Sequence, residues 1–165
     1  MLNYNSVIKN EMKQESISVK EISPVIKINL RGKKREFLTN VGKNLNMILP
    51  TEANTSTTSD KLTAIWLSPD EWMIISNELA SKDTNKSDLY EMLFNSISKT
   101  NLGAVIDVTD QFVQLELKGE NVYEIFSAGS PFNFNEFKEK KGSTTQTVLN
   151  HVDVILHHKD ENILN

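Results

Sequence analysis

The stretch Ala64-Ile-Trp-Leu-Ser-Pro-Asp-Glu-Trp-Met-Ile-Ile-Ser76 decides the fold, and it holds both tryptophans of the chain. Its two apolar runs, roughly 61–67 and 72–76, flank a Pro-Asp-Glu turn and therefore predict two strands joined at a tight corner. Because Trp66 and Trp72 carry large apolar side chains, we expect this corner to bury much of the core area. The stretch indicates a fold-determining element and does not by itself indicate catalysis.

Composition narrows the class of protein. With 165 residues and no cysteine, the chain has the size of one domain and lacks thiolates for disulfides, iron–sulfur clusters, zinc or a cysteine nucleophile. The net charge of −4 offers no electrostatic basis for binding nucleic acid or an anionic membrane. No apolar run reaches transmembrane length, and the N-terminus lacks a signal-peptide pattern, so we expect a cytoplasmic protein.

Apolar periodicity divides most of the chain into strands and helices. Residues 1–22 show no sustained period and are expected to form a flexible N-terminal arm on a single domain over 23–165. Polar stretches at 51–59 and 77–86 predict exposed loops. The predicted elements, in order, are a strand at 25–30, a helix over 37–48, strands at 61–67 and 72–76, a helix over 88–97, strands at 104–108 and 111–118, a helix over 119–129, and strands at 143–149 and 152–157.

This order spells β-α-β-β-α-β followed by β-α-β-β. The first six elements predict a ferredoxin-like split βαβ unit, and the remainder predicts a partial second copy of it. The fold class is therefore α+β, with a mostly antiparallel sheet and helices packed on it. Since 104–108 is apolar at every position except Asp107, we expect it to be a central strand covered on both faces.

Two carboxylate pairs are the first candidates for chemistry. Asp107 and Asp110 could act together as acid and base, but both lie at a reversal between predicted strands, where Asp commonly binds local backbone N–H groups. Asp70 and Glu71 follow Pro69 and are expected to shape the turn. For both pairs we favour the structural role.

The histidines are the second candidate. His151, Asp153 and His157 share one strand parity, with His158 adjacent, but a metal site needs three or four converging ligands. We therefore expect these residues to be a solvated surface. Because no nucleophile elbow or phosphate-binding loop is present either, the sequence favours a subunit or binding module over an enzyme acting alone.

Several ordered motifs resemble the gamma subunit of heterotetrameric sarcosine oxidase. The resemblance extends over about residues 25–157. The motifs are Asn29-Leu-Arg-Gly32, Leu49-Pro50 with Asn54-Thr55, Trp66-Leu-Ser-Pro-Asp-Glu-Trp72, Val105-Ile-Asp-Val-Thr-Asp110, Leu115-x-Leu-x-Gly119, Ala128-Gly-Ser-Pro-Phe-Asn-Phe134, and Gly142 leading to Thr145-Gln-Thr147. The motif residues expected to have structural roles are Trp66, Pro69, Asp70, Glu71, Trp72, Asp107, Asp110, Gly119 and Pro131.

The resemblance implies a fold related to the folate-binding region of the glycine-cleavage T-protein. It also implies membership in a four-subunit flavoenzyme that oxidises sarcosine to glycine, releasing formaldehyde or methylene-tetrahydrofolate and hydrogen peroxide. FAD, FMN, NAD and zinc would belong to the alpha, beta and delta partners. The gamma chain would hold no catalytic, cofactor-binding or metal-binding residue.

Two departures from the family pattern accompany the resemblance. Ser130 and Ser143 occupy positions where relatives often have cysteine, which argues against redox chemistry there. The family also usually continues beyond residue 165 with a further strand and helix, whose loss would leave a sheet edge unpaired. The leading hypothesis is a non-catalytic structural subunit, and the alternative is a stand-alone folate-binding or aminomethyltransferase-like protein.

Overall fold

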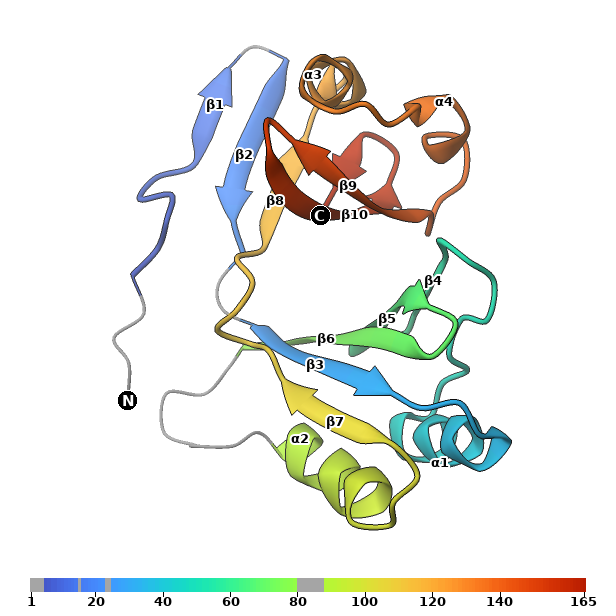
Figure 1. The fold of residues 1–165 in the computed structure, drawn as a ribbon. Helices are drawn as coiled ribbons and strands as arrows, with labels where there is room; N and C mark the ends of the chain where they lie inside the picture. The colour runs from blue at the N-terminus through green and yellow to red at the C-terminus, as the bar shows by residue number, and fades with distance from the viewer. Residues whose placement is uncertain (1–4, 15, 23–24, 80–87) are drawn as a thin grey trace. The chain divides into compact units, whose positions relative to one another are not determined.

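The computed structural model describes residues 5–14, 16–22, 25–79 and 88–165 (Figure 1). Contacts between Cα atoms divide the chain into two compact units, one within residues 24–112 and one made of residues 2–23 together with 113–165. The sequence analysis expected a flexible N-terminal arm over residues 1–22 and a single domain over 23–165. Each unit has its own sheet and its own apolar core.

The first unit is built on a five-stranded antiparallel sheet in the order β4-β5-β6-β3-β7. Leaving β4 aside, the strand order is that of a ferredoxin-like split βαβ unit, as the sequence predicted. The strands are β3 Val25–Arg31, β4 Ser56–Thr58, β5 Leu62–Ser68, β6 Glu71–Leu79 and β7 Ala104–Asp107. The helices are α1 Arg35–Leu45 and α2 Asp88–Leu93, which continues into the π-helical turn η1 Phe94–Ser98.

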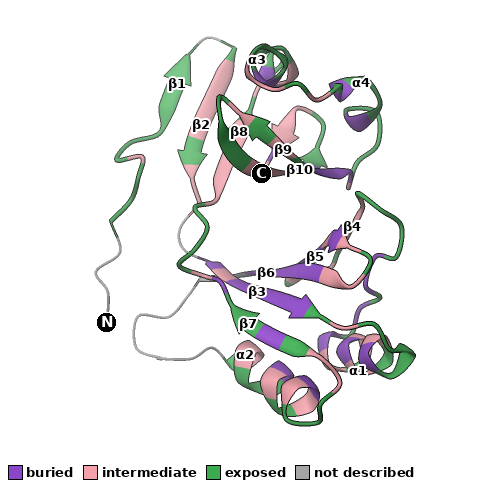
Figure 2. Ribbon diagram, in the orientation of Figure 1, coloured by how far each residue is buried: buried purple, intermediate pink, exposed green. Residues whose placement is uncertain are grey.

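One face of this sheet packs against the helices, and Figure 1 shows α1 and α2 on the same side. Ile28 and Leu30 of β3 are fully buried against Phe37 and Val41 of α1. Burial of each such side chain contributes about 1.5–3 kcal/mol. The apolar stripe of α1 therefore holds the helix on the sheet, and the purple segments of Figure 2 mark this core.

The second unit has a six-stranded sheet in the order β1-β2-β8-β11-β10-β9. The helices α3 Val122–Gly129 and α4 Phe134–Phe137 supply much of its core. Phe132, Phe134 and Phe137 meet in edge-to-face pairs with ring centroids 5.0–5.8 Å apart. The strands are β1 Met12–Gln14, β2 Ile17–Glu21, β8 Leu115–Lys118, β9 Thr144–Leu149, β10 Val152–Asp160 and β11 Ile163–Leu164.

The beginning of the chain is part of this second sheet. β2 pairs antiparallel with β8, with Val19 opposite Leu117. β8, α3, β9 and β10 follow one another as the first elements of a ferredoxin-like unit do, and β2 occupies the place beside β8 that the last strand of such a unit would take. The short strand β11 is inserted between β8 and β10. The described part of the segment expected as a flexible arm thus supplies two strands, because polar residues on an outer strand give no sustained apolar period.

Several predicted elements differ from the structure. The expected central strand at 104–108 is instead the edge strand β7, where Ile106 is 45% exposed. The N–H of Val105 donates to the Ser98 hydroxyl at 3.1 Å, which blocks part of this edge. The expected loop at 51–59 contains the strand β4. The strand expected over 111–118 is shorter in the structure, where β8 begins at Leu115 and Val113 before it is exposed.

The C-terminal hairpin agrees with its prediction. β9 and β10 pair in continuous register around Asn150 and His151, whose φ angles are 48° and 69°. Two successive residues with positive φ form the turn whose twist matches a hairpin. The sequence analysis did not predict α4, β11 or the extension of β6 to Leu79. Residues 80–86 of the loop predicted at 77–86 lie outside the described residues.

Candidate functional site

The two tryptophans face each other across β5 and β6, since Trp66 is the register partner of Trp72. Trp72 is 2% exposed, and its ring lies 5.8 Å from that of Phe37 in α1. Trp66 is half-buried against the same core. The corner therefore fastens the hairpin to the first helix, which is the fold-determining role that the sequence predicted.

The acidic turn between these strands is tied to β3. Asp70 accepts a hydrogen bond from the Ser68 hydroxyl at 2.9 Å and lies 3.6 Å from the Lys33 ammonium. The Ser68 hydrogen bond, assisted by Lys33 and Arg31, lowers the pKa of Asp70. Glu71 accepts a hydrogen bond from the Asn29 amide at 2.7 Å. Both acids thus use their oxygens to hold the turn against the neighbouring strand.

Asp107 and Asp110 lie at the other end of β3. Asp107 accepts a hydrogen bond from the Thr109 N–H at 3.0 Å, and the Thr109 hydroxyl accepts one from the Lys27 N–H at 3.1 Å. Both acids are exposed. Asp107 therefore binds a backbone N–H group of the segment that follows β7, and β3 keeps this pair apart from Asp70 and Glu71.

Lys27 is a polar core residue that the sequence analysis missed. It is 3% exposed, and its ammonium donates to the Val25 carbonyl at 3.3 Å. Burial lowers the pKa of Lys27, while Asp110 and Asp107 oppose that shift. The available sequence signal was a single lysine within the apolar run of residues 25–30.

Gly119 and Pro131 belong to the second unit. Gly119 has φ of 155°, and a Cβ there would collide with the Ser16 carbonyl oxygen and come within 2.8 Å of Ile17 Cα. Glycine is therefore required just after β8, where the backbone passes close to Ser16 and Ile17. Pro131 is exposed just after α3, and the neighbouring Ser130 hydroxyl lies 3.1 Å from the hydroxyl of Thr147.

The expectation of solvated histidines was wrong for two of the three. His157 and His158 lie in β10 and are only 6% and 4% exposed, because this strand continues to Asp160. His158 Nδ1 lies 3.2 Å and 3.1 Å from the carbonyl oxygens of Phe137 and Lys140. Carbonyls only accept, so Nδ1 carries the proton. Within the described residues, no three His, Asp or Glu side chains gather as a metal site would require.

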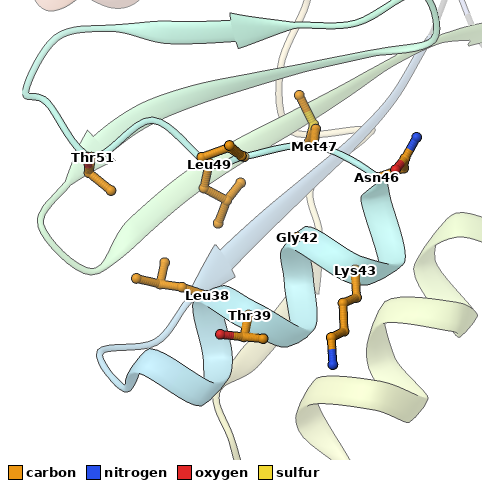
Figure 3. Close-up of a pocket in the computed structure, with 9 residues that line it drawn as sticks. Leu38, Thr39, Gly42, Lys43, Asn46, Met47, Leu49 and Thr51 are labelled. Atoms are coloured by element: carbon orange, nitrogen blue, oxygen red, sulfur yellow. The ribbon is translucent and has the colours of Figure 1, made fainter.

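Two shallow hollows lie on either side of the exposed ridge of α1, and no pattern in the sequence predicted them. The first is lined by Leu38, Gly42, Met47, Ile48 and Leu49, among others. Figure 3 shows Leu38, Thr39 and Lys43 projecting from α1, with Leu49 on the segment that follows the helix. The second hollow is lined by Arg35, Glu36, Thr39, Asn40, Lys43 and Leu102.

Comparison with known proteins decides the family. The model of the sarcosine oxidase gamma subunit family matches residues 32–165. The chain belongs to this family. The search of curated proteins found no match to this chain. Among solved structures, it is similar to a chain of the heterotetrameric sarcosine oxidase from Corynebacterium sp. U-96 in complex with pyrrole 2-carboxylate.

That similarity has a TM-score of 0.79 and covers 93% of the gamma-family chain and 76% of the matched chain, at 17% sequence identity. At this identity the likeness establishes the fold, which is the α+β class predicted from sequence. Separately, in the part of the gamma-family chain that the structure describes, no helix is long and apolar enough to cross a membrane.

Proposed function

We propose that this chain is the gamma subunit of a heterotetrameric sarcosine oxidase and that it carries no catalytic residue of its own. The single observation that supports this most strongly is the family match over residues 32–165. The similarity in fold to a chain of the Corynebacterium enzyme agrees with it. In this proposal the partners are the alpha, beta and delta subunits, and the compartment is the cytoplasm.

The proposed contribution of the chain is physical. FAD, FMN, NAD and zinc would be held by the partners, which would oxidise sarcosine to glycine and produce formaldehyde or methylene-tetrahydrofolate together with hydrogen peroxide. The contacts of the family-motif residues support this division of roles. Asp70 and Glu71 bind their neighbours on or beside β3, and Trp72 is core, so these side chains are engaged in holding the scaffold.

Co-expression tests the proposal. A tagged copy of this chain is produced together with alpha, beta and delta subunits of sarcosine oxidase, and the eluate is analysed for subunit ratio and for sarcosine-dependent peroxide formation. We expect equimolar co-purification and activity only in the assembled fraction. A chain that never retains the other subunits, or that oxidises sarcosine when purified alone, would overturn the proposal.

The alternative is a folate-binding protein that acts alone. It is motivated by the relation to the T-protein fold that the family resemblance implies, and no contact among the described residues favours it. Titration of the isolated chain with tetrahydrofolate, monitored by the fluorescence of Trp66 and Trp72, separates the two functions. Saturable quenching would favour the alternative, and we expect none.

A further inference from the structure

The loop after α1 exposes Ile48, the last residue of the helix that the sequence predicted over 37–48. The helix ends at Leu45, because Asn46 adopts a left-handed conformation with φ of 49° and the Met47 N–H bonds to the Gly42 carbonyl at 3.2 Å. Met47 and Leu49 then enter the core, and Ile48 between them is 83% exposed. No other large apolar side chain in the described residues is as exposed.

Ile48 borders a surface with the relief of a helix-docking site. The exposed residues Thr39 and Lys43 line both hollows, so they form a ridge with a groove on each side. Two helices pack when the ridges of one enter the grooves beside the ridges of the other. Of the apolar side chains that line the first groove, Ile48 is exposed and Leu38 is half-buried, whereas Met47 and Leu49 are buried. Figure 3 shows Leu38 on α1 and Leu49 on the segment that follows the helix. We call this region, defined by Arg35, Thr39, Lys43, Ile48 and the two grooves, the α1 surface.

The charge of the α1 surface indicates the chemistry of its partner. Arg35 and Lys43 are exposed, and within the described residues neither forms an ion pair. Glu36 is the only carboxylate that lines either groove. Arg35 is also the first residue of α1, where the helix dipole disfavours a cation. Carboxylates on a partner would therefore meet two cations that form no ion pair in the described part of the chain.

We propose that the α1 surface docks a helix face of another oxidase subunit, in which apolar side chains are flanked by Asp or Glu. Apolar side chains of that helix enter the groove beside Ile48, and its carboxylates lie against Arg35 and Lys43. This proposal rests on the proposed function, because it specifies where a gamma subunit meets its partner. Charge complementarity sets the orientation and the rate of association, and the apolar groove supplies the buried contact.

The test uses the full chain co-expressed with the other three subunits. Ile48→Asp removes the apolar contact, and the double variant R35E/K43E reverses the charge. Val152→Asp is the matched control for an acid at an exposed apolar position, since Val152 is 62% exposed in the second unit. Lys61→Glu is the control for charge reversal at an exposed lysine of the first unit. All four changes are at exposed positions, and circular dichroism checks that each variant folds.

We expect I48D and R35E/K43E each to weaken retention of the partner subunits about tenfold or more, as interface-centre substitutions do. Raising the salt concentration should weaken the wild-type complex more than the charge-reversed one. The two control variants should stay within about twofold of wild type, because rim and surface changes usually do.

The outcomes separate this proposal from the one on which it rests. Wild-type assembly with unchanged retention of I48D and R35E/K43E would overturn the α1 surface and leave the proposed function standing. A wild-type chain that does not assemble would overturn both. If the isolated chain forms a dimer that I48D disrupts, the occupant is a second copy, and docking of another subunit is overturned.

Discussion

The indole N–H of Trp72 donates a hydrogen bond to the carbonyl oxygen of Pro50 at 2.7 Å. Both residues are buried, and the bond joins β6 to the segment that follows α1. The tryptophan corner is therefore held to α1 by ring packing on Phe37 and to the segment after α1 by this bond. The same segment carries Ile48, so the position of the α1 surface depends on the bond.

Trp72→Phe should destabilise the first unit. The change leaves the Pro50 carbonyl without its donor in a buried site, which costs about 1–3 kcal/mol. Loss of indole volume adds to this cost. Denaturant unfolding monitored by circular dichroism measures the change. Trp66→Phe is the matched control, because Trp66 is half-buried and its indole makes no such bond in the described residues; an equal loss in both variants would contradict the role of the bond.

Gly119→Ala should loosen the N-terminal strands. The new Cβ would collide with the Ser16 carbonyl, and alanine disfavours a φ of 155°. We expect a loss of about 1–3 kcal/mol, the range for strained backbone positions. Hydrogen exchange should show faster exchange in β2 and β8.

Gly129→Ala is the control for this substitution. Its Cβ would meet the flexible end of Leu149 at 2.8 Å, and Gly129 is the last residue of a helix, where φ is not positive. A side-chain shift relieves that contact, so the effect should be small. Slower or unchanged exchange in β2 of the Gly119→Ala variant would contradict the required close approach.

Because His157 is buried, the free energy of unfolding should decrease as the pH falls from neutral into the mildly acidic range. Burial, with smaller contributions from Lys159 and His158, lowers the pKa of His157 to about 4, against about 6.5 in the unfolded chain. Below pH 6.5 the unfolded state therefore binds the proton first, and stability falls until about pH 4, by at most about 3 kcal/mol. Above pH 6.5 both states are neutral and the effect vanishes.

Unfolding free energies measured from pH 4 to pH 7.5 check this dependence. His157→Gln should flatten the slope, although it also removes a buried side chain and so lowers stability at every pH. His151→Gln is the matched control, because His151 is exposed in the hairpin turn. A slope that survives in His157→Gln would assign the pH dependence to other groups.

Asp107→Asn should leave sarcosine turnover of the assembled complex within about twofold of wild type. The Asn side-chain oxygen can still accept the Thr109 N–H, so the turn is retained and only the charge is removed. Steady-state assays of the co-purified complex measure the rate. Loss of a catalytic acid or base costs about a hundredfold or more. A fall of that size would place this carboxylate in the chemistry and contradict a non-catalytic subunit.

How much could be predicted differs between the two units. In the first unit the apolar spacings of residues 25–30, 37–45 and 88–97 follow the core directly, and the ferredoxin-like order was predicted correctly. In the second unit the N-terminal strand β2 lies beside β8, almost a hundred residues later in the chain. No local pattern encodes a pairing at that separation, so the sequence analysis did not predict the pairing of β2 with β8.

Ile48 and His158 show the same limit at single residues. The apolar spacing predicted a helix that continues to Ile48. In the structure Asn46 adopts a left-handed conformation, so the helix ends at Leu45 and Ile48 lies outside it. Two adjacent histidines in a polar stretch predicted solvent, yet His158 bonds carbonyls at the end of α4, an element that the sequence did not indicate. Each error arose where the backbone departed from a regular period.

The sequence alone determined the α+β class, the tryptophan corner and the family, because these depend on local apolar period and on motifs whose residues are close in the chain. Only the tertiary structure decided the division into two units, the burial of His157 and His158, and the exposure of Ile48 between two grooves. These properties depend on strand pairing and helix ends, which are set by contacts between residues distant in sequence and leave no local pattern.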